Sequence, residues 1–330
     1  MTGVQVKPGA RFDIVDMARG VAILAMIVYH FFWDLSFLRF FPVDVGFDPG
    51  WVAFARTILA SFLVLVGIGL VLAHGNGIRW RAFWRRWLFL LAAALAITIA
   101  TWFAFPEAFV YFGILHAIAV TSLLALPFVR APLALVVAVA AAFTLLPMVY
   151  ADPFFDQKLW SWTGLWVVAP PANDLVGLFP WFGIVLVGVA MARTVLASSL
   201  AKRLASVRAE RGVPRLLVRM GRWSLLIYLA HQPILLGLLY PLALWQKPEV
   251  NFRNAEFLGS CQSTCTAGGT SPDLCVTYCQ CGLEGLQRND LWNAIYSGMV
   301  TAREQELLDA QNRQCSALIY PELPSVTPMP

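Results

Sequence analysis

Arg19 and His30 lie in one strongly apolar stretch, and their side chains could carry out chemistry inside a membrane. The stretch reads RFDIVDMARGVAILAMIVYHFFWDL, from residue 11 to residue 35. Ionisable groups are costly in hydrocarbon, and those that persist usually face a bundle interior or a water-filled cavity. Eleven helical residues separate the two side chains by about 16 Å along the helix axis. A long substrate could therefore hold a phosphate at Arg19 and present a reactive carbon to His30.

Asp34 follows His30 by four residues, which places both on one face of a helix. A carboxylate one turn away can bond one imidazole nitrogen, so that the other nitrogen is fixed as a base. His30 and Asp34 are therefore the predicted catalytic residues. The alternative is a polar pair that anchors the outer end of the helix.

Arg11, Asp16 and Arg19 flank the inner end of the same stretch. Guanidinium groups bind phosphate bidentately, so these residues predict a site for a phosphorylated cytoplasmic cofactor. The alternative is an ordinary cationic anchor with a compensating carboxylate. His116 and His231 fall in later apolar stretches. Each is either a packed structural histidine or a residue that lines the same cavity.

The composition identifies an integral membrane protein. Of 330 residues, 59% are hydrophobic and 13% are charged, with a mean hydropathy of +0.68. A soluble domain is nearer a quarter charged. The net charge of +5 does not indicate a nucleic-acid partner, because the basic residues gather at the ends of apolar stretches. We expect the first stretch to remain as a spanning helix, since no small-residue cleavage site follows it.

Seven apolar stretches are close to the length that crosses a bilayer. They predict an all-α, polytopic helix bundle with spans near 14–37, 51–73, 84–105, 108–129, 132–150, 174–195 and 221–245. The loops after the second and sixth stretches carry half of the Arg and Lys of the chain. The positive-inside rule then places the N-terminus in the cytoplasm and the C-terminal tail outside, which is the periplasm if the membrane is a Gram-negative inner membrane.

All six cysteines lie in the last quarter of the chain, in CQSTC, CVTYC and two later positions. An even count in a polar segment suggests disulfides in an oxidising compartment. Cysteines four residues apart share a helical face, and the intervening GGTSP is a turn signal. Two short antiparallel helices could be joined by Cys261–Cys279 and Cys265–Cys275, which leaves Cys281 for Cys315. Six cysteines allow fifteen pairings, and a zinc site is the rival interpretation. No metal is predicted.

The chain therefore divides into a membrane domain, residues 1–245, and a small helical, disulfide-rich exterior segment, residues 246–330. Its last residues, PELPSVTPMP, have the composition of an unstructured segment.

Four segments, in order, resemble a known family. These are RFDIVDMARGVAILAMIVYHFFWDL, FGILHAIAV around His116, LFPWFGIVLVG and GRWSLLIYLAHQPIL. They resemble bacterial proteins related to heparan-α-glucosaminide N-acetyltransferase, within the broader transmembrane acyltransferase superfamily. In that superfamily an arginine, ten residues and a histidine form a recurrent motif, which Arg19 and His30 match. The resemblance covers about the first 245 residues and none of the cysteine-rich tail.

The resemblance implies transfer of an acyl group, acetyl above all, from cytoplasmic acyl-CoA to a hydroxyl or amine of an exported or lipid-linked glycan. His30 would act as general base or as a transient acyl carrier. Arg19 would contact the CoA phosphates, and His116 and His231 would line the same cavity. Membrane lipids would surround the helix bundle. The rival is a non-catalytic membrane scaffold that binds a protein partner through residues 247–330. A transporter is a third alternative, which the shortage of acidic residues within the apolar stretches disfavours.

Overall fold

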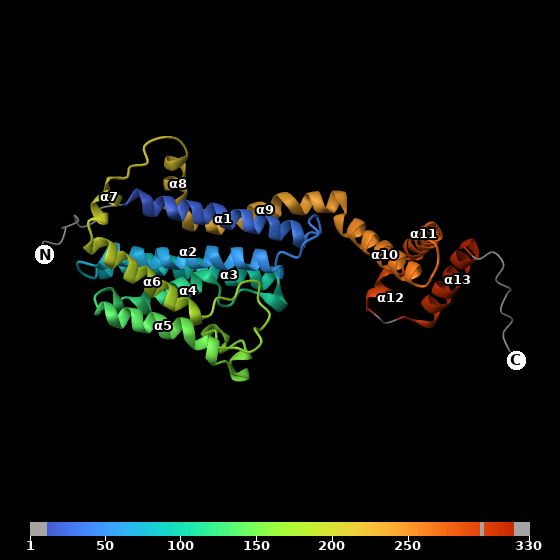
Figure 1. The fold of residues 1–330 in the computed structure, drawn as a ribbon, viewed down its shortest axis with the longest axis horizontal. Helices are drawn as coiled ribbons and strands as arrows, with labels where there is room; N and C mark the ends of the chain where they lie inside the picture. The colour runs from blue at the N-terminus through green and yellow to red at the C-terminus, as the bar shows by residue number, and fades with distance from the viewer. Residues whose placement is uncertain (1–11, 298–299, 320–330) are drawn as a thin grey trace. The chain divides into compact units, whose positions relative to one another are not determined.

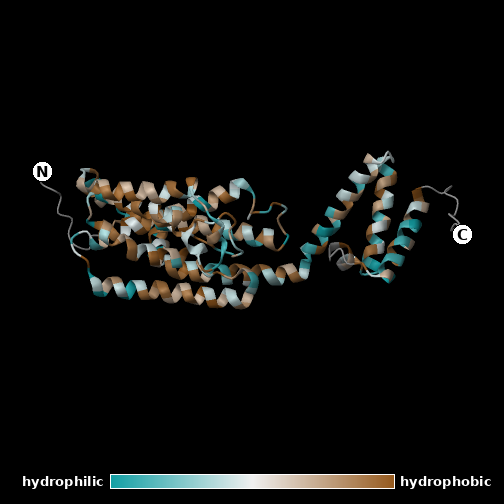
Figure 2. Ribbon diagram, turned by 90° about the horizontal axis from the view of Figure 1, so that it is seen from below, coloured by the Kyte–Doolittle hydropathy of each residue, from teal (hydrophilic) through white to brown (hydrophobic). Residues whose placement is uncertain are grey.

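A computed structural model describes residues 12–297 and 300–319 of the chain. Its regular secondary structure is helical, as the composition predicted. The chain divides into two compact units, which are described separately. The first comprises residues 1–34 and 43–238, and the second residues 35–42 and 239–330. In Figure 2 hydrophobic residues dominate the helices of the first unit, whereas hydrophilic residues are frequent in those of the second.

Each of the seven predicted apolar stretches contains a helix. Five helices are long and apolar enough to cross a membrane: α1 (Asp13–Phe37), α2 (Pro49–His74), α3 (Trp80–Ala104), α6 (Leu178–Ala197) and α9 (Ser224–Gln246). Two are shorter apolar helices, α4 (Ile114–Ala125) and α5 (Leu133–Val149). The predicted fold class, a polytopic all-α membrane protein with a disulfide-rich helical C-terminal segment, is thereby confirmed.

Helix α4 begins six residues later than the predicted fourth stretch, which started at residue 108. The intervening backbone pairs with the loop before α6 instead of continuing as helix. Asn173 N donates to Ala108 O at 2.8 Å, and Val176 N donates to Phe112 O at 3.0 Å. Hydropathy alone does not distinguish this extended segment from helix, because its residues are equally apolar.

The core of the first unit forms where α6 packs against α2 and α5 (Figure 1). Gly67 and Gly188 allow the α2 and α6 backbones to approach closely. A Cβ atom at Gly67 would overlap the Val185 carbonyl oxygen, and one at Gly188 would overlap that of Val64. Small residues at helix contacts are typical of membrane proteins, where packing takes over from the hydrophobic effect between helices.

Two shorter helices, α7 (Leu200–Ser206) and α8 (Gly212–Arg222), come after α6 and before α9 in the chain. Helix α8 packs closely on α1, because Gly20 faces the Leu217 carbonyl and Gly221 faces the Asp16 carbonyl without intervening side chains. Ile23 and Met26 of α1 are buried against α2, α8 and α9. Helix α1 therefore contacts α2, α8 and α9 through these side chains.

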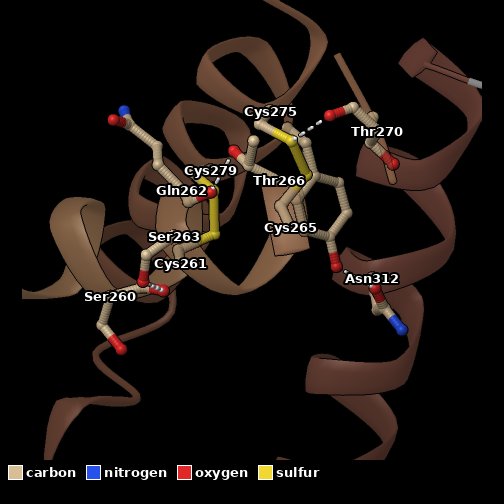
Figure 3. Close-up of a disulfide and its surroundings, with 11 residues drawn as sticks. Ser260, Cys261, Gln262, Ser263, Cys265, Thr266, Thr270, Cys275, Cys279 and Asn312 are labelled. Carbon is tan, nitrogen blue, oxygen red and sulfur yellow. Dashed lines mark hydrogen bonds between the residues drawn. A yellow bond between two sulfur atoms is a disulfide. The ribbon is translucent and has the colours of Figure 1, made fainter. Parts of the chain in front are cut away.

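The second unit contains α10 (Pro248–Ala267), α11 (Pro272–Arg288), α12 (Trp292–Ser297) and α13 (Ala302–Ile319). Its disulfides are Cys261–Cys279 and Cys265–Cys275 (Figure 3), together with Cys281–Cys315, the pairs that helix geometry favoured. The first two join α10 to α11, and the third joins α11 to α13. A small apolar core lies beside them, formed by Phe257, Leu286, Leu291, Trp292, Leu307 and Leu308. Three crosslinks supplement a core too small to stabilise such a unit well by itself.

Candidate functional site

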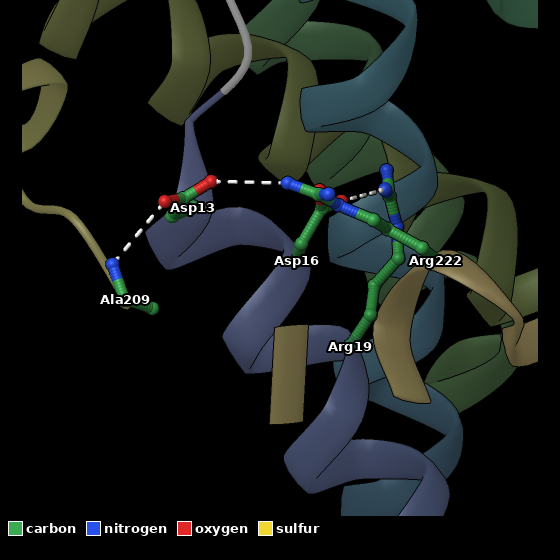
Figure 4. Close-up of polar contacts among 5 residues, drawn as sticks. All are labelled: Asp13, Asp16, Arg19, Ala209 and Arg222. Atoms are coloured by element: carbon green, nitrogen blue, oxygen red, sulfur yellow. Dashed lines mark hydrogen bonds and ion pairs between the residues drawn. The ribbon is translucent and has the colours of Figure 1, made fainter. Parts of the chain in front are cut away.

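A network of two acids and two arginines lies at the N-terminal end of α1 (Figure 4). Arg19 Nη1 contacts Asp16 Oδ1 at 3.1 Å. Arg222 of α8 contacts both acids, with Nη2 at 3.3 Å from Asp13 Oδ1 and Nε at 3.3 Å from Asp16 Oδ2. Arg11, the other predicted phosphate-binding residue, lies outside the described residues. Asp16 therefore holds Arg19 and Arg222 together, and its predicted contact with a substrate stays a prediction.

A cavity of about 820 Å³ begins beside this network, between α1, α2, α3, α4 and α9. Its wall carries the guanidinium groups of Arg19, Arg79, Arg85 and Arg86. A second cavity of about 440 Å³ shares Arg19, Arg79 and Arg86 with it and is also lined by Asp16 and Arg222. Arginines outnumber acids in both walls, so the site favours a ligand with several negative charges.

The deeper wall of the larger cavity is apolar. On α3 the residues that line it beyond Arg86 are Trp87, Phe89 and Leu90, which lie within about 6 Å of helix. Ile23, Ile114 and Tyr228 line it from α1, α4 and α9. The cavity therefore has arginines at one end and apolar side chains beyond them.

His30 and His231 lie together further along α1 and α9. Their rings are 4.9 Å apart, and Gln232 Nε2 donates to Asp34 Oδ1 at 2.6 Å. His231 Nδ1 donates to the Tyr228 carbonyl at 2.6 Å, which leaves Nε2 of the neutral ring as a proton acceptor. Among the described residues, four buried atoms here have no hydrogen-bond partner: His30 Nδ1, Asp34 Oδ2, His231 Nε2 and Gln232 Oε1.

The expected hydrogen bond between Asp34 and His30 is not formed. Asp34 is fully buried and accepts its hydrogen bond from Gln232, while His30 Nδ1 has no partner among the described residues. Gln232 lies 198 residues from Asp34 in the sequence, so helix spacing could not reveal this competitor. The ring beside that of His30 belongs to His231, and a protonated His231 would repel a positive charge on His30. The catalytic roles of His30 and Asp34 stay predictions.

His116 occupies a different position from the other two histidines. Its Nδ1 accepts from Gly113 N at 3.2 Å, and its Nε2 lies 3.2 Å from Thr98 Oγ1. Both ring nitrogens thus have protein partners at the start of α4, where unpaired backbone donors need acceptors. The predicted contact of His116 with a substrate is untested by this geometry.

Asp174 is a further candidate that the sequence reasoning missed. Its Oδ2 accepts from Ile114 N at 2.9 Å, at the first residue of α4, and it occupies the space that Gly113 leaves open. Burial raises the pKa of this carboxyl from its ordinary 3.8 to about 6, although the hydrogen bond from Ile114 opposes the shift. Asp174 is the one acidic residue between positions 156 and 210, which was the available signal.

Within the described ranges, no group of three or more His, Cys, Asp or Glu side chains could hold a metal ion. The residues brought together are thus arginines at one end of α1, and histidines with amide and carboxyl groups toward the other. This arrangement describes a polytopic membrane protein with an internal cavity that arginines line at one end.

The comparison with protein families identifies the class more closely. The model of the heparan-alpha-glucosaminide N-acetyltransferase catalytic domain matches residues 11–233, about two thirds of the chain. The chain belongs to this family of membrane N-acetyltransferases, as its four sequence segments indicated. No curated protein and no solved structure matches the chain. The family match ends within α9, so it does not include α10 to α13 of the tail.

Proposed function

We propose that the protein moves an acyl group, acetyl above all, from acyl-CoA on the cytoplasmic side to a hydroxyl or amine of a sugar on the outer side. The observation that carries this proposal is the cavity lined by Arg19, Arg79 and Arg86, because Arg19 lies on helix α1, which also carries His30. The family match supports acyl transfer as the reaction, and acetyl-CoA is the donor that the family uses.

The cationic end of the cavity suits the donor's nucleotide. Coenzyme A has three phosphate groups, and guanidinium groups bind phosphate through paired hydrogen bonds. Gly69 contributes space, because a Cβ there would lie 3.0 Å from Arg19 Nη2. The apolar wall beyond accommodates the pantetheine arm. On α1 the cavity is lined by Arg19 and Ile23, so an arm that brings the thioester to His30 has to extend about 10 Å along the helix beyond Ile23.

The two histidines supply the proton acceptor. As general base, His30 or His231 takes the proton of the acceptor hydroxyl or amine while its oxygen or nitrogen attacks the thioester carbonyl. The carbon–sulfur bond breaks, and the CoA thiolate takes up a proton as it leaves. In the alternative route His30 attacks first and carries the acyl group before the acceptor arrives. The unpartnered oxygens of Asp34 and Gln232 would accept hydrogen bonds from the sugar.

The direction of transfer follows from the basic loops. Arg79, Arg81, Arg85 and Arg86 follow α2, and a longer basic stretch follows α6, at the ends that the positive-inside rule assigns to the cytoplasm. The tail would then be exterior, where its disulfides are stable. The proposed acceptor is an exported or lipid-linked glycan.

The tail also supports a second candidate, a scaffold that binds a partner complex outside the membrane. Residues 239–330 form most of a separate compact unit with three disulfides, and no catalytic step above involves them. Deleting the chain after residue 247 distinguishes the scaffold from the acyltransferase. A scaffold loses a partner that co-purifies in fixed stoichiometry, whereas an acyltransferase keeps its turnover.

The test of the enzyme is transfer or hydrolysis of radiolabelled acetyl-CoA by purified protein. His30→Ala should abolish turnover while the thermal unfolding transition stays within a few degrees of wild type. Val28→Ala is the matched control, since Val28 lies on the same helix and is 40% exposed. It should retain wild-type turnover. Full activity in folded His30→Ala protein would refute the catalytic assignment.

A further inference from the structure

Helix α8 carries three arginines, and a fourth, Arg211, precedes the helix in extended backbone. Arg215 and Arg219 are four residues apart, and Arg222 comes three residues later. Residues at these intervals lie on one helix face, about 6 Å or less apart along the axis. The guanidinium groups of Arg215, Arg219 and Arg222 are therefore on one side of a helix of about three turns, and Arg211 adds a fourth cation at its start.

Of these four arginines, Arg222 forms ion pairs and the other three form none among the described residues. Arg222 contacts Asp13 and Asp16 of α1. Arg211, Arg215 and Arg219 are exposed, and no carboxylate of the residues that the structure describes makes an ion pair with them. We call these three residues the arginine row. Uncompensated like charges at this spacing repel one another and are stabilised by an anionic partner.

Apolar side chains beside the arginine row indicate what that partner is. Val213 and Leu216 are 68% and 56% exposed, although Leu217 and Gly221 of the same helix pack on α1. An exposed apolar strip next to a basic strip is the pattern of helices that lie in the membrane interface. A free anion or an acidic soluble ligand would leave the apolar strip in water.

The position of α8 in the chain supports the same partner. Trp223, which is 63% exposed, follows α8 directly, and the apolar helix α9 begins at Ser224. Exposed tryptophan at the end of a spanning helix is characteristic of the membrane–water boundary. Helix α8 also packs on the first two turns of α1 through Gly20 and Gly221. Both contacts place α8 where two spanning helices enter the membrane.

We propose that the arginine row is a binding site for anionic phospholipid headgroups, with Val213 and Leu216 inserted among the upper acyl carbons. The phosphate of an anionic lipid accepts hydrogen bonds from the guanidinium groups, and its net charge neutralises the row. A zwitterionic headgroup brings its own cation and would gain much less. Each arginine near such a surface contributes about fivefold to affinity, so the row contributes about 100-fold. This proposal is independent of the acyl-transfer chemistry.

The test is retention of phosphatidylglycerol by the full-length protein purified in mild detergent. Fluorescent phosphatidylglycerol is titrated in and displaced with unlabelled phosphatidylglycerol, phosphatidylcholine or inorganic phosphate. Wild type should bind the anionic lipid, and only unlabelled phosphatidylglycerol should displace it efficiently. The triple variant Arg211→Gln, Arg215→Gln, Arg219→Gln should bind about 100-fold more weakly.

A charge-matched control replaces three exposed tail arginines, Arg288, Arg303 and Arg313, with glutamine. This control should bind within about twofold of wild type. If the arginine-row variant fails to fold, the single variant Arg215→Gln should still lose about fivefold. Unchanged binding in the folded row variant overturns the proposal. Equal displacement by phosphatidylcholine, or by inorganic phosphate, overturns it as well, because the site would then not select an anionic lipid.

Discussion

Replacing Asp174 with asparagine should change how the stability of the protein depends on pH. The fold raises the pKa of this carboxyl from 3.8 to about 6, because burial disfavours its charged form. The shift is about 2 units, and each unit corresponds to about 1.4 kcal/mol, so ionisation costs at most about 3 kcal/mol. Asparagine keeps the size of the side chain and an oxygen that can accept from Ile114 N, but it cannot ionise.

The sign follows from proton binding. Between about pH 4 and pH 6 the native protein holds a proton on Asp174 that the unfolded chain has already released. The contribution of Asp174 to stability is therefore fully present below about pH 4. It is lost as the pH rises through about 6. The asparagine variant has no carboxyl to ionise at this position. Its free energy of unfolding should therefore rise relative to that of wild type as the pH increases from about 4 to about 6.

Thermal unfolding in detergent at pH values from about 4 to about 8, followed by tryptophan fluorescence, measures this difference. Comparing the two proteins at each pH removes the contributions of all other groups. Asp44→Asn is the control, because Asp44 is an exposed loop carboxylate of the same unit. A difference between Asp174→Asn and wild type that does not vary with pH, or that varies in the opposite direction, would refute the reasoning.

Three further predictions concern the tail, the core and the cavity. Replacing Cys281 and Cys315 with serine opens a loop of 34 residues and should lower the stability of the tail by up to about 4 kcal/mol in urea unfolding; an unchanged midpoint would contradict this. Gly67→Leu should prevent folding, since its side chain meets the α6 backbone, whereas Gly237→Leu, with open space around it, should give wild-type yields; equal yields of both variants would refute the packing argument. Arg86→Gln should raise the KM for acetyl-CoA by about tenfold or more with little change in kcat, and an unchanged KM would exclude Arg86 from donor binding.

Features set by neighbouring residues could be predicted from the sequence. Apolar length predicted where the spanning helices lie, because a bilayer imposes a length on any stretch that crosses it. The intervals of four between cysteines, with a Gly-Gly turn between them, led to the disulfide pairs of α10 and α11. Both inferences depend on residues that are close in sequence, namely the length of an apolar stretch and the spacing of cysteines along a helix.

Contacts between distant segments were not predictable in this way. Asp34 bonds Gln232 instead of His30, and Asp174 bonds the start of α4, across 198 and 60 residues respectively. Arg222 of α8 likewise forms ion pairs with Asp13 and Asp16 of α1. Each depends on which helices pack together, which a single sequence does not specify. The partner expected for Asp34 was therefore wrong, and the site residues of α1 stay predictions.

The proposed reaction transfers an acyl group from acyl-CoA on one side of the membrane to a sugar on the other. Proteoliposomes that enclose an amino sugar, with radiolabelled acetyl-CoA added outside, test it directly. We expect labelled N-acetyl sugar inside vesicles that contain wild-type protein and background label with His30→Ala. Label that never reaches the enclosed sugar in wild-type vesicles, or reaches it equally with His30→Ala, would rule out transfer by this route.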